Sequence, residues 1–186
     1  MRIRFCISFI LLILLASYGC GRGSSEMDMK QAQKAMDQAK SLHADDLAPT
    51  DFQLAQKTWA HAQAAAKEGK TDTAKVLFVS AKIYFNKSGV IAKAKRDALS
   101  RELSALQLMI SSNFDEVKSD LSRKDVSPRL RNQVKAIASE VEEGNAAISK
   151  LVNQENFLKA VATAKDVQMK IYNAQLILAG QKPSSK

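Results

Sequence analysis

The sequence predicts an all-α protein built from elongated antiparallel helical hairpins, and three observations support this fold class. Ala, Lys, Gln and Glu, which have high helix propensity, are abundant, whereas aromatic residues make up only 6% of the 186 residues. Apolar residues recur three and four positions apart over long stretches, which is the spacing of one helix face. Residues that end or begin helices, namely Pro49, Gly69, Pro128 and Gly180, stand where these stretches stop or start.

The amino terminus has the organisation of an export signal. Residues 1–4 are short and cationic, and residues 5–16 form a nearly continuous apolar run. Twelve residues span only about 18 Å as a helix, which is too short for a hydrocarbon core of about 30 Å. Residues 1–19 are therefore predicted to be a signal peptide rather than a membrane span.

Cys20 is predicted to carry a lipid anchor. Residues 17–20 (SYGC) resemble the bacterial lipobox, in which small residues precede a cysteine that is diacylated. The other cysteine, Cys6, lies in the signal, and acylation consumes a thiol that would otherwise be free and exposed. Gly21 is not the Asp of an inner-membrane retention signal, so we expect an outer-membrane lipoprotein facing the periplasm rather than the inner membrane. The alternative is ordinary cleavage after Gly19, which would leave Cys20 as a free thiol.

The first half of the mature chain is predicted to hold three helices. After a flexible tether that ends at residue 25, the first helix spans about 26–42, and the segment 45–49 interrupts the helical pattern. A second helix starts at Thr50 or Asp51, either of which could cap it, and ends at Gly69.

A third, very long helix is predicted over about 72–121. Unbroken, it would measure about 75 Å. A break near Gly89 or at 111–113 is the alternative, because these residues favour helices less.

The second half is predicted to form one more hairpin. A helix begins at Ser127-Pro128, a turn follows at 153–156, the last helix runs from 157 to Gly180, and residues 181–186 form a disordered tail. The helical domain, 26–180, thus comprises tetratricopeptide-like helix–turn–helix pairs at about 50–122 and 128–180. The turn 69–74 aligns with the turn 155–160.

One stretch resembles a known family. Residues 47–55 (LAPTDFQLA), 62–69 (AQAAAKEG) and Ala74 are similar to the "AP…ELxxA…A…G…A" pattern of the DUF4398 family of bacterial envelope proteins. The resemblance covers about residues 30–100. It implies Ala-rich helices behind a lipoprotein signal, and it implies no active site, because the function of that family is unknown.

The charge of the chain favours anionic partners in the envelope. The formal net charge is +9, and removal of Arg2 and Arg4 with the signal leaves 26 basic and 19 acidic residues, or +7. Few aromatic residues accompany the basic ones, and the compartment argues against nucleic acid. Possible contacts for an anionic ligand, such as a lipid headgroup or wall polymer, cluster at one turn: Arg123, Lys124, Arg129 and Arg131.

No catalytic residue, cofactor or metal site is predicted. Gly69-Lys70-Thr71 matches the end of a phosphate-binding loop but lacks its first glycine, which would stand at Ala64. His43 and His61 are eighteen residues apart, and Glu140 and Glu143 are expected on a solvated face.

The expected role is therefore that of a membrane-anchored structural or adaptor protein that binds a protein partner or itself. Residues 76–79 (VLFV) are apolar on all sides of the helix, which predicts burial on more than one side, either by the first helix or by another subunit. The alternative role is a binding module for anionic envelope ligands.

Overall fold

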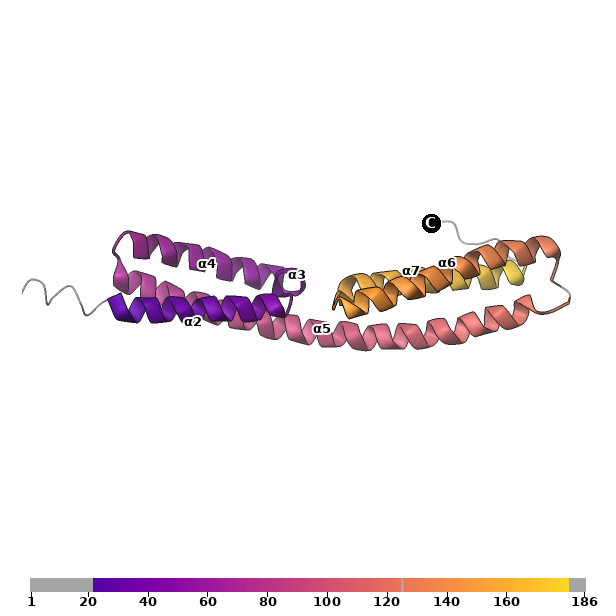
Figure 1. Ribbon diagram of the computed structural model, residues 1–186, viewed down its shortest axis with the longest axis horizontal. Helices are drawn as coiled ribbons and strands as arrows, with labels where there is room; N and C mark the ends of the chain where they lie inside the picture. Colours follow the sequence, from indigo (N-terminus) through magenta and orange to yellow (C-terminus); the bar gives the residue numbers. More distant parts are fainter. Residues whose placement is uncertain (1–21, 125, 181–186) are drawn as a thin grey trace, which may run out of the picture. The chain divides into compact units, whose positions relative to one another are not determined.

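The computed structural model describes residues 22–124 and 126–180, and this part of the chain is helical without any strand. Figure 1 shows the helices in chain order. They are α2 (Arg22–Ser41), α3 (Ala44–Leu47), α4 (Pro49–Lys67), α5 (Thr71–Leu121), α6 (Pro128–Asn153) and α7 (Phe157–Leu178). The predicted all-α class is confirmed. The predicted signal, Cys20 and the tail at 181–186 lie outside the described residues.

Helix α5 is continuous over 51 residues, so neither of the breaks considered from the sequence occurs. Gly89 does not interrupt the helix. It is buried, and a Cβ placed there would lie 3.5 Å from Leu42 Cδ1 and 3.7 Å from Ala39 Cα. A methyl group at 89 would make only ordinary van der Waals contacts there, so the packing of α5 against α2 does not require glycine at this position.

The chain divides into two compact units, one ending at Lys95 and the other beginning at Arg96. Unit 1 contains α2, α3, α4 and the first half of α5, and unit 2 contains the second half of α5 with α6 and α7. Helices α4 and α5, and α6 and α7, follow one another as the predicted hairpins do. Each compact unit, however, groups three long helical segments, because a third apolar face is needed to close a core that two helices leave open.

Unit 1 has an Ala-rich core. Ala32, Ala62 and Ala74 from α2, α4 and α5 are fully buried around Phe78. Their small side chains let the helix backbones approach closely, and two edge-to-face aromatic pairs fill the remaining space. Trp59 meets Phe78 with ring centroids 5.1 Å apart, and Phe52 meets Phe85 at 5.5 Å.

Unit 2 has an aliphatic core. Leu103, Ile110 and Val117 of α5 pack with Val141 and Ile148 of α6. Helix α7 contributes a continuous stripe of buried residues: Ala160, Val161, Ala164, Val167, Ile171, Ala174 and Ile177. This spacing of three and four is the helical period that the sequence displayed.

The two turns that align in sequence also have the same pattern of backbone hydrogen bonds. At the end of α4, Lys70 N donates to Ala65 O (2.9 Å) and Gly69 N to Ala66 O (3.1 Å). At the end of α6, Asn156 N donates to Leu151 O and Glu155 N to Val152 O, both at 2.9 Å. Both are Schellman endings, with Gly69 (φ 76°) and Glu155 (φ 54°) in the left-handed region. Ala74 and Ala160, five residues on, are fully buried in both cases.

Helix starts differ from the sequence prediction at several places. Helix α2 begins at Arg22, so residues 22–25 are helical and not a tether, because extending a helix by a turn adds hydrogen bonds without a new nucleus. Helix α4 begins at Pro49 with Ala48 as an N-cap that makes no side-chain hydrogen bond. Neither Thr50 nor Asp51 caps it, because Pro can occupy the first helical position without losing a needed donor.

The start signal at Ser127-Pro128 is confirmed, and the structure adds a second cap at Asn156. The Ser127 hydroxyl accepts from Leu130 N at 3.4 Å ahead of Pro128, and the Asn156 side chain accepts from Lys159 N at 3.3 Å ahead of Phe157.

Candidate functional site

The first half of α5 is apolar on two opposite sides. Buried residues such as Ala81 and Phe85 face the core of unit 1. Val or Ile stays exposed at five positions. Four of them share one side of the helix, namely Val76 (64%), Val79 (39%), Ile83 (58%) and Val90 (70%), whereas Ile91 (36%) lies about 100° from Val90. Residues two apart on a helix lie about 200° from one another, and Ile83 stands two residues from both Ala81 and Phe85. The four exposed residues on one side therefore form a stripe opposite the core.

We call this stripe the α5 seam and define it by residues 76, 79, 83, 86 and 90, whose spacing alternates between three and four. That spacing is the repeat of apolar contact positions in a coiled coil. The fourth position is Asn86, which is exposed, and the other four are Val or Ile. Scattered single apolar residues are common on protein surfaces, but an aligned row of four is the signature of a contact surface.

Lysines flank the α5 seam. Residues 71–95 contain five lysines and one acidic residue, Asp72. Lys82 Nζ donates to Gln31 Oε1 of α2 at 2.7 Å, and Lys87 pairs with Asp51 of α4 at 2.7 Å. The hydrogen bond and the charge of Asp51 raise the pKa of Lys87 above its usual value. Among the described residues, Lys75 and Lys93 have no carboxylate within ion-pair distance, so their charges are available to a partner.

Packing within unit 1 covers residues 76–79 on one side only. Phe78 is buried and Leu77 is partly buried, whereas Val76 and Val79 are exposed. The first helix therefore does not cover the second side, and the burial of that side by another subunit stays a prediction. Packing within unit 1 covers one face of α5 and leaves the other open. The sequence signal that marks the open face is the regular spacing that continues from Val79 to Ile83 and Val90.

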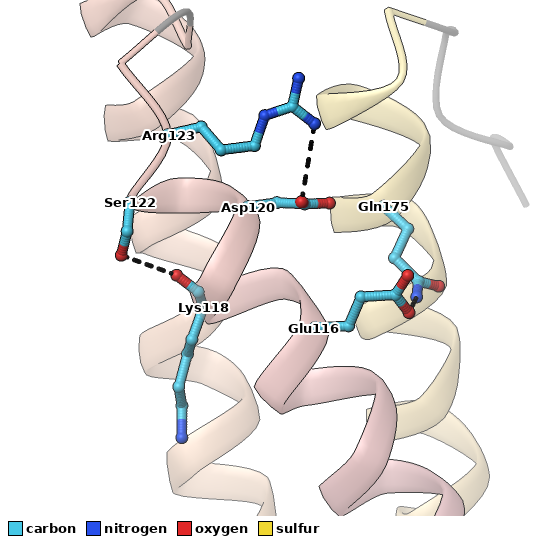
Figure 2. Close-up of polar contacts among 6 residues, drawn as sticks. All are labelled: Glu116, Lys118, Asp120, Ser122, Arg123 and Gln175. Atoms are coloured by element: carbon cyan, nitrogen blue, oxygen red, sulfur yellow. Dashed lines mark hydrogen bonds and ion pairs between the residues drawn. The ribbon is translucent and has the colours of Figure 1, made fainter.

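The four basic residues of the turn between α5 and α6 have different roles. Arg123, Lys124 and Arg129 are exposed, and Arg123 forms an ion pair with Asp120 at 3.7 Å, as Figure 2 shows. Arg131 instead serves the turn itself. One of its terminal nitrogens, Nη2, donates to Arg123 O at 2.9 Å and to Val126 O at 3.4 Å. Arg123 and Arg131 are therefore engaged in contacts within this part of the chain, and Lys124 and Arg129 present their charge to solvent.

Unit 2 has a groove of about 510 Å³ between α5 and α7. Leu106 and Asn113 line it from α5, and Lys165, Met169 and Tyr172 from α7. The two helices are also joined across their faces by polar contacts. Gln175 Nε2 donates to Glu116 Oε2 at 3.1 Å (Figure 2), and Lys165 pairs with Glu102 at 2.7 Å. These contacts hold α7 against α5 beside the groove, whose lining mixes apolar side chains with polar ones such as Asp166.

The histidines, Glu140 and Gly69, which were considered from the sequence, lie on helices and in turns. His43 has φ 55° in the turn after α2, and His61 is exposed on α4. Glu140 pairs with Lys170 at 2.6 Å, which ties α6 to α7. Gly69 ends α4 as described above. Across the described ranges, no three His, Cys, Asp or Glu side chains come together in a way that could hold a metal.

No family model matches this chain, and no curated protein or solved structure matches it significantly. Within residues 22–124 and 126–180, each helix is either too short or too polar to cross a bilayer. The geometry of the α5 seam, with its flanking charges, is therefore the main guide to function.

Proposed function

We propose that this protein is a lipid-anchored protein of the bacterial cell envelope that acts as a structural or adaptor module and catalyses no reaction. Cys20 is the anchor, and the outer membrane, facing the periplasm, is the favoured location. The observation that carries the adaptor role is the α5 seam, a row of four exposed β-branched residues on the face opposite the core. Such a face gains free energy when a partner covers it, at about 25 cal/mol per Å² of apolar surface.

The anchor is supported by the sequence alone. The signal of residues 1–19 and the lipobox-like residues 17–20 agree with the resemblance to DUF4398 envelope proteins over about residues 30–100. Two or more acyl chains on Cys20 would hold the protein stably at a bilayer, because each buried CH₂ contributes about 0.8 kcal/mol.

Replacing Cys20 with Ala tests the anchor. Cells grown with an alkyne fatty acid should label the wild-type protein and leave the Cys20→Ala variant unlabelled, and the variant should move from the membrane fraction to the soluble fraction. The measurement is in-gel fluorescence of each fraction after detection of the alkyne. A variant that stays with the membranes would show that something other than acylation holds the protein there.

Photo-crosslinking in intact cells tests the adaptor role. A photoreactive residue at position 83 of the α5 seam should give a discrete protein adduct. The same residue at position 56, which is exposed on α4 and carries Gln, should not. The absence of a protein adduct at position 83 would contradict the adaptor role.

The alternative function is binding of an anionic envelope ligand at the α5–α6 turn. The exposed side chains of Arg123, Lys124 and Arg129 favour it, since they place three positive charges within seven residues. Binding of this kind should weaken as salt is raised, because exposed charges are screened beyond about 10 Å at 0.1 M.

A further inference from the structure

The width of the α5 seam indicates what kind of surface covers it. The seam is a narrow row with one side chain every three or four residues, from Val76 to Val90. Helices that lie in a membrane interface have a broad apolar face rich in Trp, Phe and Leu. A narrow row at alternating spacing of three and four is instead the contact strip of two helices that pack knobs into holes. A helix is therefore the best-fitting occupant.

The shape of the row fits a single partner helix. Val76, Ile83 and Val90 stand seven residues apart and alternate with Val79 and Asn86, so the contact positions form one narrow strip with a heptad repeat. The row spans 15 residues, or about 21 Å along the helix, which is two heptads. The partner must therefore offer two heptads with apolar residues at the matching positions.

The flanking charges determine the chemistry of that partner. Lys75 and Lys82 precede seam residues Val76 and Ile83, and Lys87 lies beside the row farther along α5. Lys93, three residues after Val90, stands at the end of the row. A second copy of this chain would bring the same lysines against them, and like charges across the contact are unfavourable. A helix with Asp and Glu beside its apolar row would form charge pairs instead, with Lys75 and Lys93 free to take part.

Asn86 would fix how a partner helix aligns along the row. It is exposed and occupies a seam position between Ile83 and Val90. A partner helix that covers the row would bury its amide, which then needs a hydrogen-bonding group opposite it. A polar residue at one contact position is known to fix the register and the number of strands at a cost in stability.

We infer that the α5 seam binds an acidic amphipathic helix of another protein as a two-stranded coiled coil, with Asn86 setting the register. This inference rests on the proposed adaptor function and identifies the class of its partner. The lysine flanks attract the partner, the β-branched row supplies the apolar contact, and the opposite face of α5 continues to hold the core of unit 1.

A matched pair of peptides tests the inference. Each has Ile and Leu at its contact positions and one Asn in the middle. One peptide has Glu at all flanking positions, and the other has Lys. The full chain, purified in detergent, is titrated against each fluorescent peptide, and anisotropy reports binding. The Glu peptide should bind, more weakly as NaCl is raised, and the Lys peptide should not.

Two protein variants locate the contact. Ile83→Glu places a charge in the row and should weaken binding of the Glu peptide by roughly tenfold or more. Leu54→Glu makes the same kind of change at an exposed apolar residue of α4 (46%) and should leave binding unchanged. Circular dichroism should give the same helix content for both variants, since both positions are exposed.

The outcomes separate the inference from the function on which it rests. Equal binding of both peptides, equal effects of the two variants, or no binding of the Glu peptide would overturn the inference. The inference would also be overturned if the chain dimerised, or bound anionic phospholipid vesicles, and Ile83→Glu abolished that dimerisation or that binding. A protein adduct at position 83 in cells, combined with no binding of the Glu peptide, would leave the adaptor function standing and refute the acidic helix.

Discussion

At the scale of single residues, two glycines inside helices have opposite surroundings. Gly89 of α5 has space for a methyl group, since its nearest neighbour would be Leu42 Cδ1 at 3.5 Å. Gly144 of α6 has none, because a Cβ there would collide with the side chain of Val167 on α7. Val167 is buried and β-branched, so it cannot turn aside easily. Sequence alone could not distinguish the two, as both stand in strongly helical stretches.

The Gly144→Ala variant should destabilise the protein by about 1–2 kcal/mol. Overpacking a core costs about 1–3 kcal/mol, and the better helix propensity of Ala returns about 0.5–1 kcal/mol. Gly89→Ala, the matched control, should be neutral or stabilising by up to about 1 kcal/mol. Urea denaturation measures both. If Val167→Ala does not relieve the cost of Gly144→Ala in the double variant, the collision is not its cause.

Arg131 shows how a residue's role depends on its neighbours. In the sequence it belongs to a cluster of four basic residues, and that pattern favours an anion site. In the structure its side chain reaches back to the carbonyl groups of Arg123 and Val126. Both carbonyl groups lie within eight residues of Arg131, but whether its side chain reaches them depends on the backbone conformation of the turn, which residue type and spacing do not give.

At the scale of elements, the α4–α5 and α6–α7 turns are the clearest agreement between sequence and structure. The alignment of 69–74 with 155–160 predicts equivalent positions, and the hydrogen bonds of the two Schellman endings confirm it. The residues at the left-handed position differ, however. Gly69 adopts a positive φ without strain, whereas Glu155 does so at a cost of about 1–2 kcal/mol.

Exchanging the residue types at these turns should therefore have opposite effects. Glu155→Gly should raise the free energy of unfolding by about 1 kcal/mol, because relief of strain exceeds the loss of its exposed ion pair with Arg96 at 3.8 Å. Gly69→Ala should lower it by about 1 kcal/mol or more. Thermal unfolding followed by circular dichroism measures both. A Glu155→Gly variant less stable than the wild type would show that the charge of Glu155 matters more than its backbone.

Some helix boundaries can be predicted from the neighbouring residues alone, and others cannot. Ser127-Pro128 starts a helix as predicted, because a side-chain acceptor and a fixed φ act within one turn. The start of α4 differs because Pro49 serves as the first residue without a side-chain cap. The short helix α3 lies in the stretch that was expected to interrupt the pattern. There Ala44 and Leu47 are buried, and burial of this kind depends on contacts that the local sequence does not reveal.

At the scale of the whole molecule, the chain forms two compact units that share one helix. Unit 1 packs its alanines around Phe78, and unit 2 packs aliphatic side chains such as Ile148. Each of these buried clusters draws its members from one unit. Stability in such an arrangement need not be uniform, since separate cores can open separately.

Core truncations should therefore act within one unit. Phe78→Ala, which removes about 3–5 kcal/mol of packing, should reduce amide protection against hydrogen exchange in α2, α4 and residues 71–95. Protection in α6 and α7 should persist. Ile148→Ala should have the reverse effect. Hydrogen exchange measured by mass spectrometry gives the protection of each segment, and an equal loss in both units for either variant would mean that they unfold as one.

The amino-acid sequence by itself determines the all-α class and most helix ends, because these depend on propensity, capping and spacing within a few residues. It also determines that residues 76–79 are apolar on every side. The sequence leaves open whether α5 runs unbroken past Gly89 and 111–113, and the structure shows that it does. Only the tertiary structure decides which side of α5 becomes core. Unit 1 has two neighbouring helices, and they cover one face, so Phe78 and Phe85 are buried while Val76 and Ile83 remain exposed. The grouping of three helical segments into each unit is decided in the same way, by packing between residues far apart in the chain.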